Sequence, residues 1–117
     1  MPDLVDDDSF AVSFPLWFLV HPKLKSKGFI TVMSESSEKG SPFFTDMDLA
    51  KRFQSESPEL AHYVGANAHP DQLLGVLDML EAEGYTHITI DHTHRGAMFF
   101  PIPEVRHYLV GYRRARS

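Results

Sequence analysis

The segment 41–53, SPFFTDMDLAKRF, constrains the fold more than any other part of the chain. The aromatic pair Phe43 and Phe44 ends an extended stretch, and the residues after it have the pattern of an amphipathic helix. Thr45 is suited to be the N-cap of that helix, because its hydroxyl can accept a hydrogen bond from the amide of Asp48. The segment therefore predicts a strand-to-helix junction, and it carries no obvious nucleophile, metal cage or phosphate loop.

The apolar pattern of the whole chain predicts a mixed order of strands and helices. The expected extended segments are residues 16–20, 29–33, 42–45, 86–91 and 97–102. Helices are expected after Thr45, from Pro70 to a C-terminal glycine at Gly84, and from Pro103 onward. Residues 59–68 are ambiguous, with a short helical turn at 60–64 as one possibility. This order favours an α+β fold with a mixed, mostly antiparallel sheet and two to three helices packed mainly on one face.

The length of 117 residues is that of one domain. We expect residues 1–9 to be an acidic flexible leader, residues 10–112 a single α+β domain, and residues 113–117 a basic C-terminal tail. The absence of cysteine excludes disulfides, thiolate catalysis and Cys-ligated metal sites. The net charge of −5 disfavours nucleic acid as the main partner.

The N-terminal sequence is acidic where a signal peptide would be basic, and the apolar run at 14–20 is too short to span a membrane. We therefore expect a cytoplasmic protein that binds neither membrane nor nucleic acid and that needs no cofactor.

The junction also carries a family resemblance. The run from Phe43 to Asp46, with Leu49, Ala50 and Phe53 after it, resembles a segment in the N-terminal domain of the SseB family. The later order of helix, strand and final helix over residues 73–109 is similar as well. The resemblance implies a small α+β interaction or regulatory domain and does not imply a reaction.

Seven histidines are the one unusual feature of the composition. If the strand at 86–91 continued, His92 and His94 would point the same way, as two metal ligands would, and His62 or His69 could supply a third. We favour the alternative that the chain turns after His92 and that both rings cap the sheet end or lie in water. A metal- or ligand-binding protein or enzyme that uses these histidines is therefore the second functional hypothesis.

The first hypothesis is a non-catalytic module that binds a protein partner or a second copy of itself. Its surface is expected on the polar face of the strand at 86–91, where His87, Thr89 and Asp91 alternate with core residues. The loop after this strand contains Arg95, which could bind a carboxylate. The expected contact residues are His87, Asp91, His92, His94 and Arg95.

Overall fold

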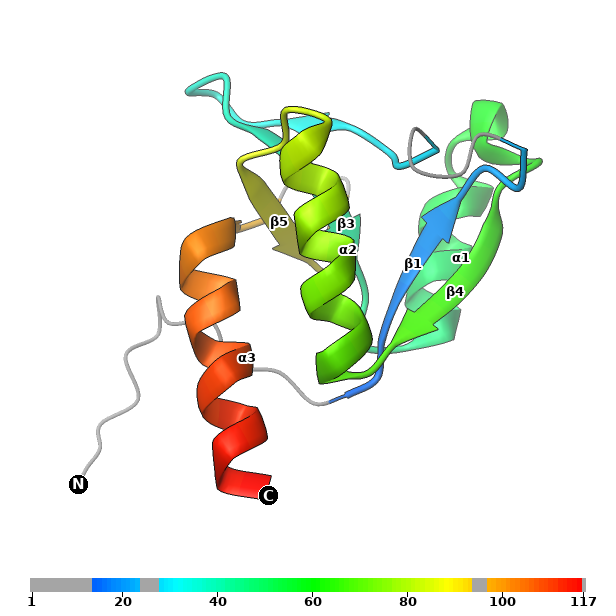
Figure 1. The fold of residues 1–117 in the computed structure, drawn as a ribbon. Coiled ribbons are helices and arrows are strands. Elements are labelled where there is room, and N and C mark those ends of the chain that lie inside the picture. The colour runs from blue at the N-terminus through cyan, green and yellow to red at the C-terminus, as the bar shows by residue number, and fades with distance from the viewer. Residues whose placement is uncertain (1–13, 24–27, 94–96, 117) are drawn as a thin grey trace.

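A computed structural model describes residues 14–23, 28–93 and 97–116 of the chain (Figure 1). The strands are β1 (Leu16–Val20), β2 (Val32–Met33), β3 (Lys39–Phe43), β4 (Val64–Ala68), β5 (His87–Ile90) and β6 (Phe99–Pro101). The helices are α1 (Met47–Ser55), α2 (Pro70–Ala82) and α3 (Ile102–Arg116), with a short 3-10 turn, η2 (Pro58–Leu60), between α1 and β4. The expected α+β class is confirmed.

Two sheets meet at the middle of the molecule. One has the strand order β2-β3-β5-β6, in which β3 and β5 are parallel and the other pairs are antiparallel. The other is the antiparallel pair β1-β4, in which Leu16 pairs with Ala68. Trp17 connects the two sheets, because it exchanges two backbone hydrogen bonds of 2.7 Å with Phe44. The sheet structure is therefore mixed and mostly antiparallel, as expected.

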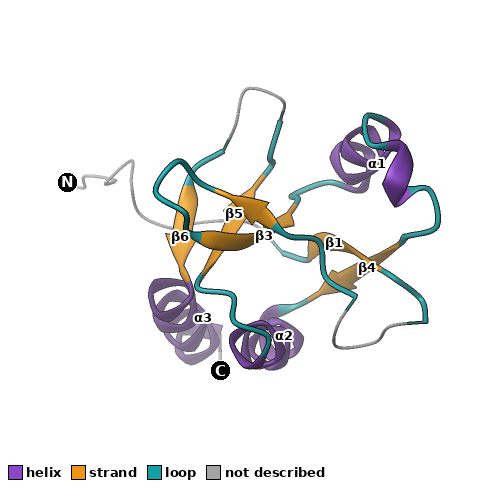
Figure 2. Ribbon diagram, turned by 90° about the horizontal axis from the view of Figure 1, so that it is seen from above, coloured by secondary structure: helices purple, strands orange, loops and turns teal. Residues whose placement is uncertain are grey.

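Helices lie on both sides of these strands, with α2 and α3 on one side and α1 on the other (Figure 2). Helices α2 and α3 enclose the larger apolar core, where Leu77 and Leu109 pack with Phe43 and Ile88. Helix α1 lies on the opposite side, where Ala50 packs in a second cluster with Leu19 and Phe44. Residues of β1 alternate between the two clusters, which explains why apolar side chains occur at both parities of this strand.

The cap of α1 corrects one expectation from the sequence. Asp46, not Thr45, is the N-cap, and its carboxylate accepts a hydrogen bond of 2.7 Å from the amide of Asp48. The hydroxyl of Thr45 instead donates to the carboxylate of Asp91 at 2.8 Å. The two residues are 46 positions apart, so no local pattern could have indicated the bond.

The middle of the chain also differs from the expectation. In place of a helical turn at 60–64, the structure has η2 followed by the strand β4. The segment at 29–33 is mostly irregular. Phe29 bridges to Val20 of β1, and only Val32 and Met33 pair with β3. The main neighbour of β1 is consequently β4, and not the segment that follows β1 in the sequence.

Candidate functional site

The polar face of β5, where we expected the partner surface, is largely closed. Thr89 is fully buried, and its hydroxyl has no hydrogen-bond partner among the described residues. Half-buried His87 has its Nε2 3.2 Å from the carboxylate of Glu38. Pro42 of β3 and Phe99 of β6 are the cross-strand neighbours of Thr89 on this face. The expectation of an open face is therefore wrong at Thr89.

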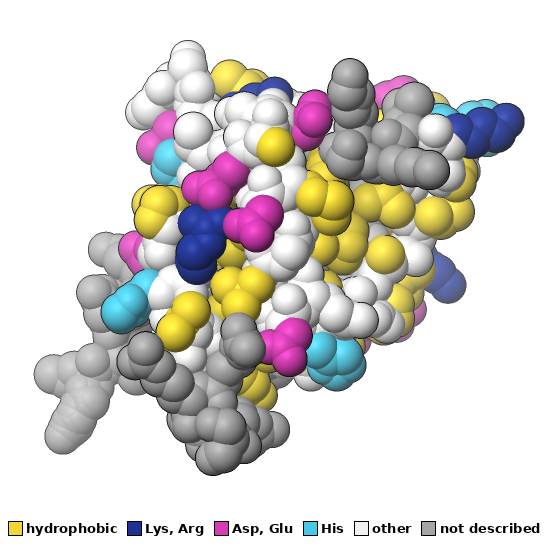
Figure 3. Space-filling model, viewed as in Figure 1, with side chains coloured by type: hydrophobic (Ala, Val, Ile, Leu, Met, Phe, Trp, Pro, Cys, Tyr) yellow, Lys and Arg dark blue, Asp and Glu magenta, His cyan; other side chains and the backbone are white. Residues whose placement is uncertain are grey.

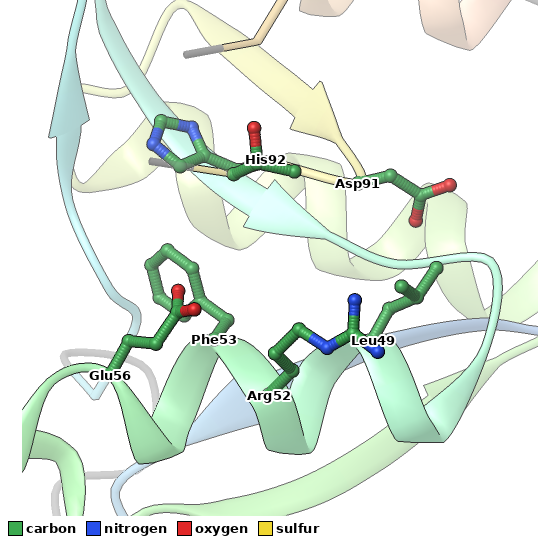
Figure 4. A pocket seen from close by; sticks show the side chains of 7 residues that line it. Leu49, Arg52, Phe53, Glu56, Asp91 and His92 are labelled. Carbon is green, nitrogen blue, oxygen red and sulfur yellow. The ribbon is translucent and has the colours of Figure 1, made fainter. Parts of the chain in front are cut away.

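Beyond β5, the chain lines a small pocket against α1 (Figure 4). The pocket lies where the parallel strands β3 and β5 end, which is a common place for ligands in sheets of this kind. Its volume is about 160 Å³, below the range of about 300–1,000 Å³ that is usual for ligand sites. Its lining residues are Leu49, Arg52, Phe53, Glu56, Asp91, His92 and Thr93.

Asp91 fastens the end of β5 to the start of α1. Its carboxylate accepts hydrogen bonds of 2.8 Å from both the amide and the hydroxyl of Thr45, and its own amide donates to the carbonyl of Phe43 at 2.8 Å. Its φ of 54° is in the left-handed region, which aspartate tolerates better than most residues. Its carboxylate points away from His92 (Figure 4). Asp91 therefore has a structural role at this position.

The ring of His92 packs on the other side of the pocket. It meets the ring of Phe53 edge-on, with 5.6 Å between the ring centroids. Burial lowers the pKa of His92 below its usual value. Its Nδ1 is buried and has no partner among the described residues. A buried N–H without a partner at Nδ1 would cost more than a buried lone pair there. This difference favours the tautomer with the proton on Nε2.

The remaining histidines of the metal hypothesis lie elsewhere. His62 is exposed in the turn before β4, and His69 is exposed at the N-terminus of α2, where its amide donates to the side chain of Gln72 at 3.0 Å. Across residues 14–23, 28–93 and 97–116, no three His, Cys, Asp or Glu side chains are grouped so that they could hold a metal ion. His94 and Arg95 lie outside the described residues, so their expected roles stay predictions.

A second candidate surface, which the sequence did not reveal, is the outer edge of β4. Within the part of the chain that the structure describes, β4 pairs only with β1. Trp17 directs its backbone groups toward Phe44. In an antiparallel pair the direction alternates along the strand, so Leu16 and Phe18 direct theirs toward β4. Gly65 and Asn67 consequently point their N–H and C=O groups outward; we call these four groups the open edge of β4.

The open edge is limited to those two residues because their neighbours bond within the chain. The amide of Tyr63 donates to Leu60 at 3.0 Å, and its carbonyl accepts from the side chain of Gln54 at 2.8 Å. At the other end, the amide of His69 bonds Gln72, and its carbonyl accepts from Leu73 at 2.8 Å. The edge is thus short and bounded at both ends.

An apolar face lies beside the open edge. Val64 is 47% exposed, and Val20 and Ala66 on the same face are partly buried. Figure 3 shows hydrophobic side chains gathered on this side of the molecule, next to α2 and over β1 and β4. The opposite face of β4 is covered by α1, where Met47 occupies the space that a Cβ at Gly65 would need. Only one face of β4 is therefore open.

Apart from its short length, β4 itself has none of the sequence features that commonly protect exposed strands. Edge strands are often blocked by a charged side chain, a proline or a bulge. Residues 60–70 contain no Asp, Glu, Lys or Arg, and β4 pairs with β1 without a bulge and has no proline. The sequence signal was the alternation of Val64, Ala66 and Ala68, but small residues with low strand propensity made it weak.

The described residues form a small α+β domain in which β4 has an open edge. No family model matches the chain, and no curated protein matches it. No helix of the described residues is long and apolar enough to cross a lipid bilayer.

Proposed function

We propose that the chain is a non-catalytic interaction module that binds an extended polypeptide segment along the open edge of β4. The observation that supports this proposal is the outward direction of the backbone groups of Gly65 and Asn67, next to the exposed Val64. In strand addition, backbone hydrogen bonds supply affinity, and the side chains beside them supply selectivity.

The pocket at the end of β5 supports the non-catalytic part of the proposal. Both carboxylate oxygens of Asp91 are used by Thr45, and the ring of His92 packs against Phe53. A histidine that acts as a general base must reach a substrate proton, and a third group commonly orients its ring. The contacts of Asp91 and His92 instead fit structural roles.

The resemblance to the SseB family, carried by residues 43–53, implies the same class of interaction or regulatory domain. The lack of cysteine fits a reducing compartment, so we place the module in the cytoplasm. The SseB relationship and the location are both parts of the proposal.

A blocked seven-residue peptide of alternating valine and threonine is a suitable probe, because strand addition depends mainly on the backbone. Titrated into labelled protein, it is expected to shift the amide signals of Gly65 and Asn67 most and to slow their hydrogen exchange. Val64→Lys should weaken this binding at least about fivefold, since a charge on the edge face opposes strand addition.

Met98→Lys is the matched control, because Met98 is also 47% exposed but lies before β6. Shifts concentrated at the pocket of Asp91 and His92, or equal binding by Val64→Lys and the parent protein, would contradict the proposal.

A further inference from the structure

We propose that the partner of the open edge is β4 of a second copy of this chain, paired antiparallel about a two-fold axis at Ala66. The inference rests on the proposed function, because it uses the same edge. It goes further by naming the occupant and the register.

The symmetry of the edge supports a second copy. Gly65 and Asn67 lie one residue on either side of Ala66, and each directs one N–H and one C=O outward. With the axis at Ala66, Gly65 of one copy faces Asn67 of the other. An antiparallel pair of this kind exchanges two hydrogen bonds, and the axis generates the pair twice. All outward donors and acceptors of both copies are then satisfied, and none remains.

The boundaries of the edge agree with this register. The groups of Tyr63 and His69 are already bonded within the chain, and these two residues face each other across the same axis. The pairing therefore ends at the same point on both copies. A longer strand from an unrelated protein would meet no free backbone groups of β4 beyond Gly65 and Asn67.

The charges also favour contact at this place. Each copy carries a net charge of −5, so two copies repel each other over most approaches. Residues 60–70 are free of Asp, Glu, Lys and Arg, which makes this edge a surface of low repulsion.

The apolar face would gain cover from the same contact. Val64 of one copy faces Ala68 of the other on the side next to α2, so part of its exposed side chain would leave water. The strand pair is short, however, and such an interface falls in the class of small, transient contacts. We therefore expect a weak dimer with a Kd on the order of 100 μM.

Sedimentation of the full chain between about 10 μM and about 1 mM tests the inference. The expected result is a shift from monomer to dimer over this range. In the same range, hydrogen exchange at Gly65 and Asn67 should slow with rising concentration, while the amide of Ala66 is protected throughout by β1.

Two variants and one control localise the contact. Asn67→Pro removes an outward N–H without removing a bond to β1, and Val64→Lys adds a charge on the edge face. Each should raise the Kd at least tenfold, whereas Met98→Lys should leave it unchanged. Val64→Lys keeps the test valid if the proline variant does not fold.

The outcomes separate the inference from the proposed function. A protein that is monomeric at about 1 mM but binds the valine–threonine peptide at Gly65 and Asn67 would overturn the dimer and leave the interaction module standing. A dimer that Val64→Lys and Asn67→Pro do not weaken would overturn this register. A monomer that also fails to bind the peptide would overturn both.

Discussion

The end of β5 and the edge of β4 handle polar groups in opposite ways. At the end of β5, Asp91 and Thr45 satisfy one another, and polar Thr89 is buried. At β4, Gly65 and Asn67 have no charged side chain, yet their backbone groups face outward. Polar side chains in the sequence therefore mark the closed region, and small uncharged residues mark the open one.

At the closed end of β5, Asp91→Ala should have the largest effect on the free energy of unfolding. It removes two hydrogen bonds to Thr45 that a carboxylate strengthens, so we expect a loss of about 2 kcal/mol in the free energy of unfolding. Denaturant unfolding measures the loss, and Asp91→Asn, which keeps one acceptor, should lose less. A change below about 0.5 kcal/mol for the alanine variant would show that Asp91 does not fasten β5 to α1.

Thr89→Val should stabilise the closed region, whereas Asp91→Ala should destabilise it. The valine has nearly the same shape and removes a buried hydroxyl without a partner among the described residues. We expect a gain of about 1 kcal/mol in the free energy of unfolding, read as a higher Tm. Thr86→Val, which removes an exposed hydroxyl that is hydrogen-bonded to Nδ1 of His87 at 2.7 Å, is the contrasting variant and should not raise the Tm. A lower Tm for Thr89→Val would mean that the buried hydroxyl is hydrogen-bonded.

His92 should make the closed region sensitive to acid. Because burial lowers its pKa in the folded protein, the unfolded chain binds a proton first as the pH falls. The contribution of His92 to stability is therefore full above the unfolded pKa of about 6.5 and is lost as the pH falls below it. Denaturant midpoints measured from pH 7.5 to pH 5 should fall less steeply in His92→Phe. An identical pH dependence in both proteins would refute the assignment.

The smallest effect on stability is expected at the open edge. Val64→Lys should change the free energy of unfolding by less than about 0.5 kcal/mol, because the side chain is already 47% exposed. Leu77→Ala, in the core beneath α2, should cost about 3 kcal/mol under the same conditions. If Val64→Lys destabilised the monomer as much, β4 would be a covered strand and not an open edge.

Much of the fold could be predicted from local patterns. Leu16–Val20 is a strand, and Pro70 and Gly84 bracket α2, because a short continuous apolar run, proline at N1 and a glycine with φ of 89° are local signals. The α+β class followed from the order of these elements. The confirmed predictions all depend on residues that are neighbours in the sequence.

The candidate surfaces depend on distant partners and could not be predicted in the same way. Val64–Ala68 becomes a strand because β1, more than 40 residues earlier, supplies its hydrogen bonds. Thr89 looks exposed by alternation, but it is buried on a face that it shares with Pro42 and Phe99, its neighbours from β3 and β6. The same reason explains Thr45, whose hydroxyl reaches Asp91 and not its own helix.

The parallel pairing of β3 with β5 affects how the chain folds. β4 and the helices on either side of it lie within the connection between these two strands, so the central sheet can close only when this whole connection is in place. Pairings between distant segments form slowly, because the intervening chain must first be ordered. A nascent chain that ends before residue 87 lacks β5. The contacts that set the edge of β4, by contrast, are all made by residues up to Leu73, so this edge does not depend on β5.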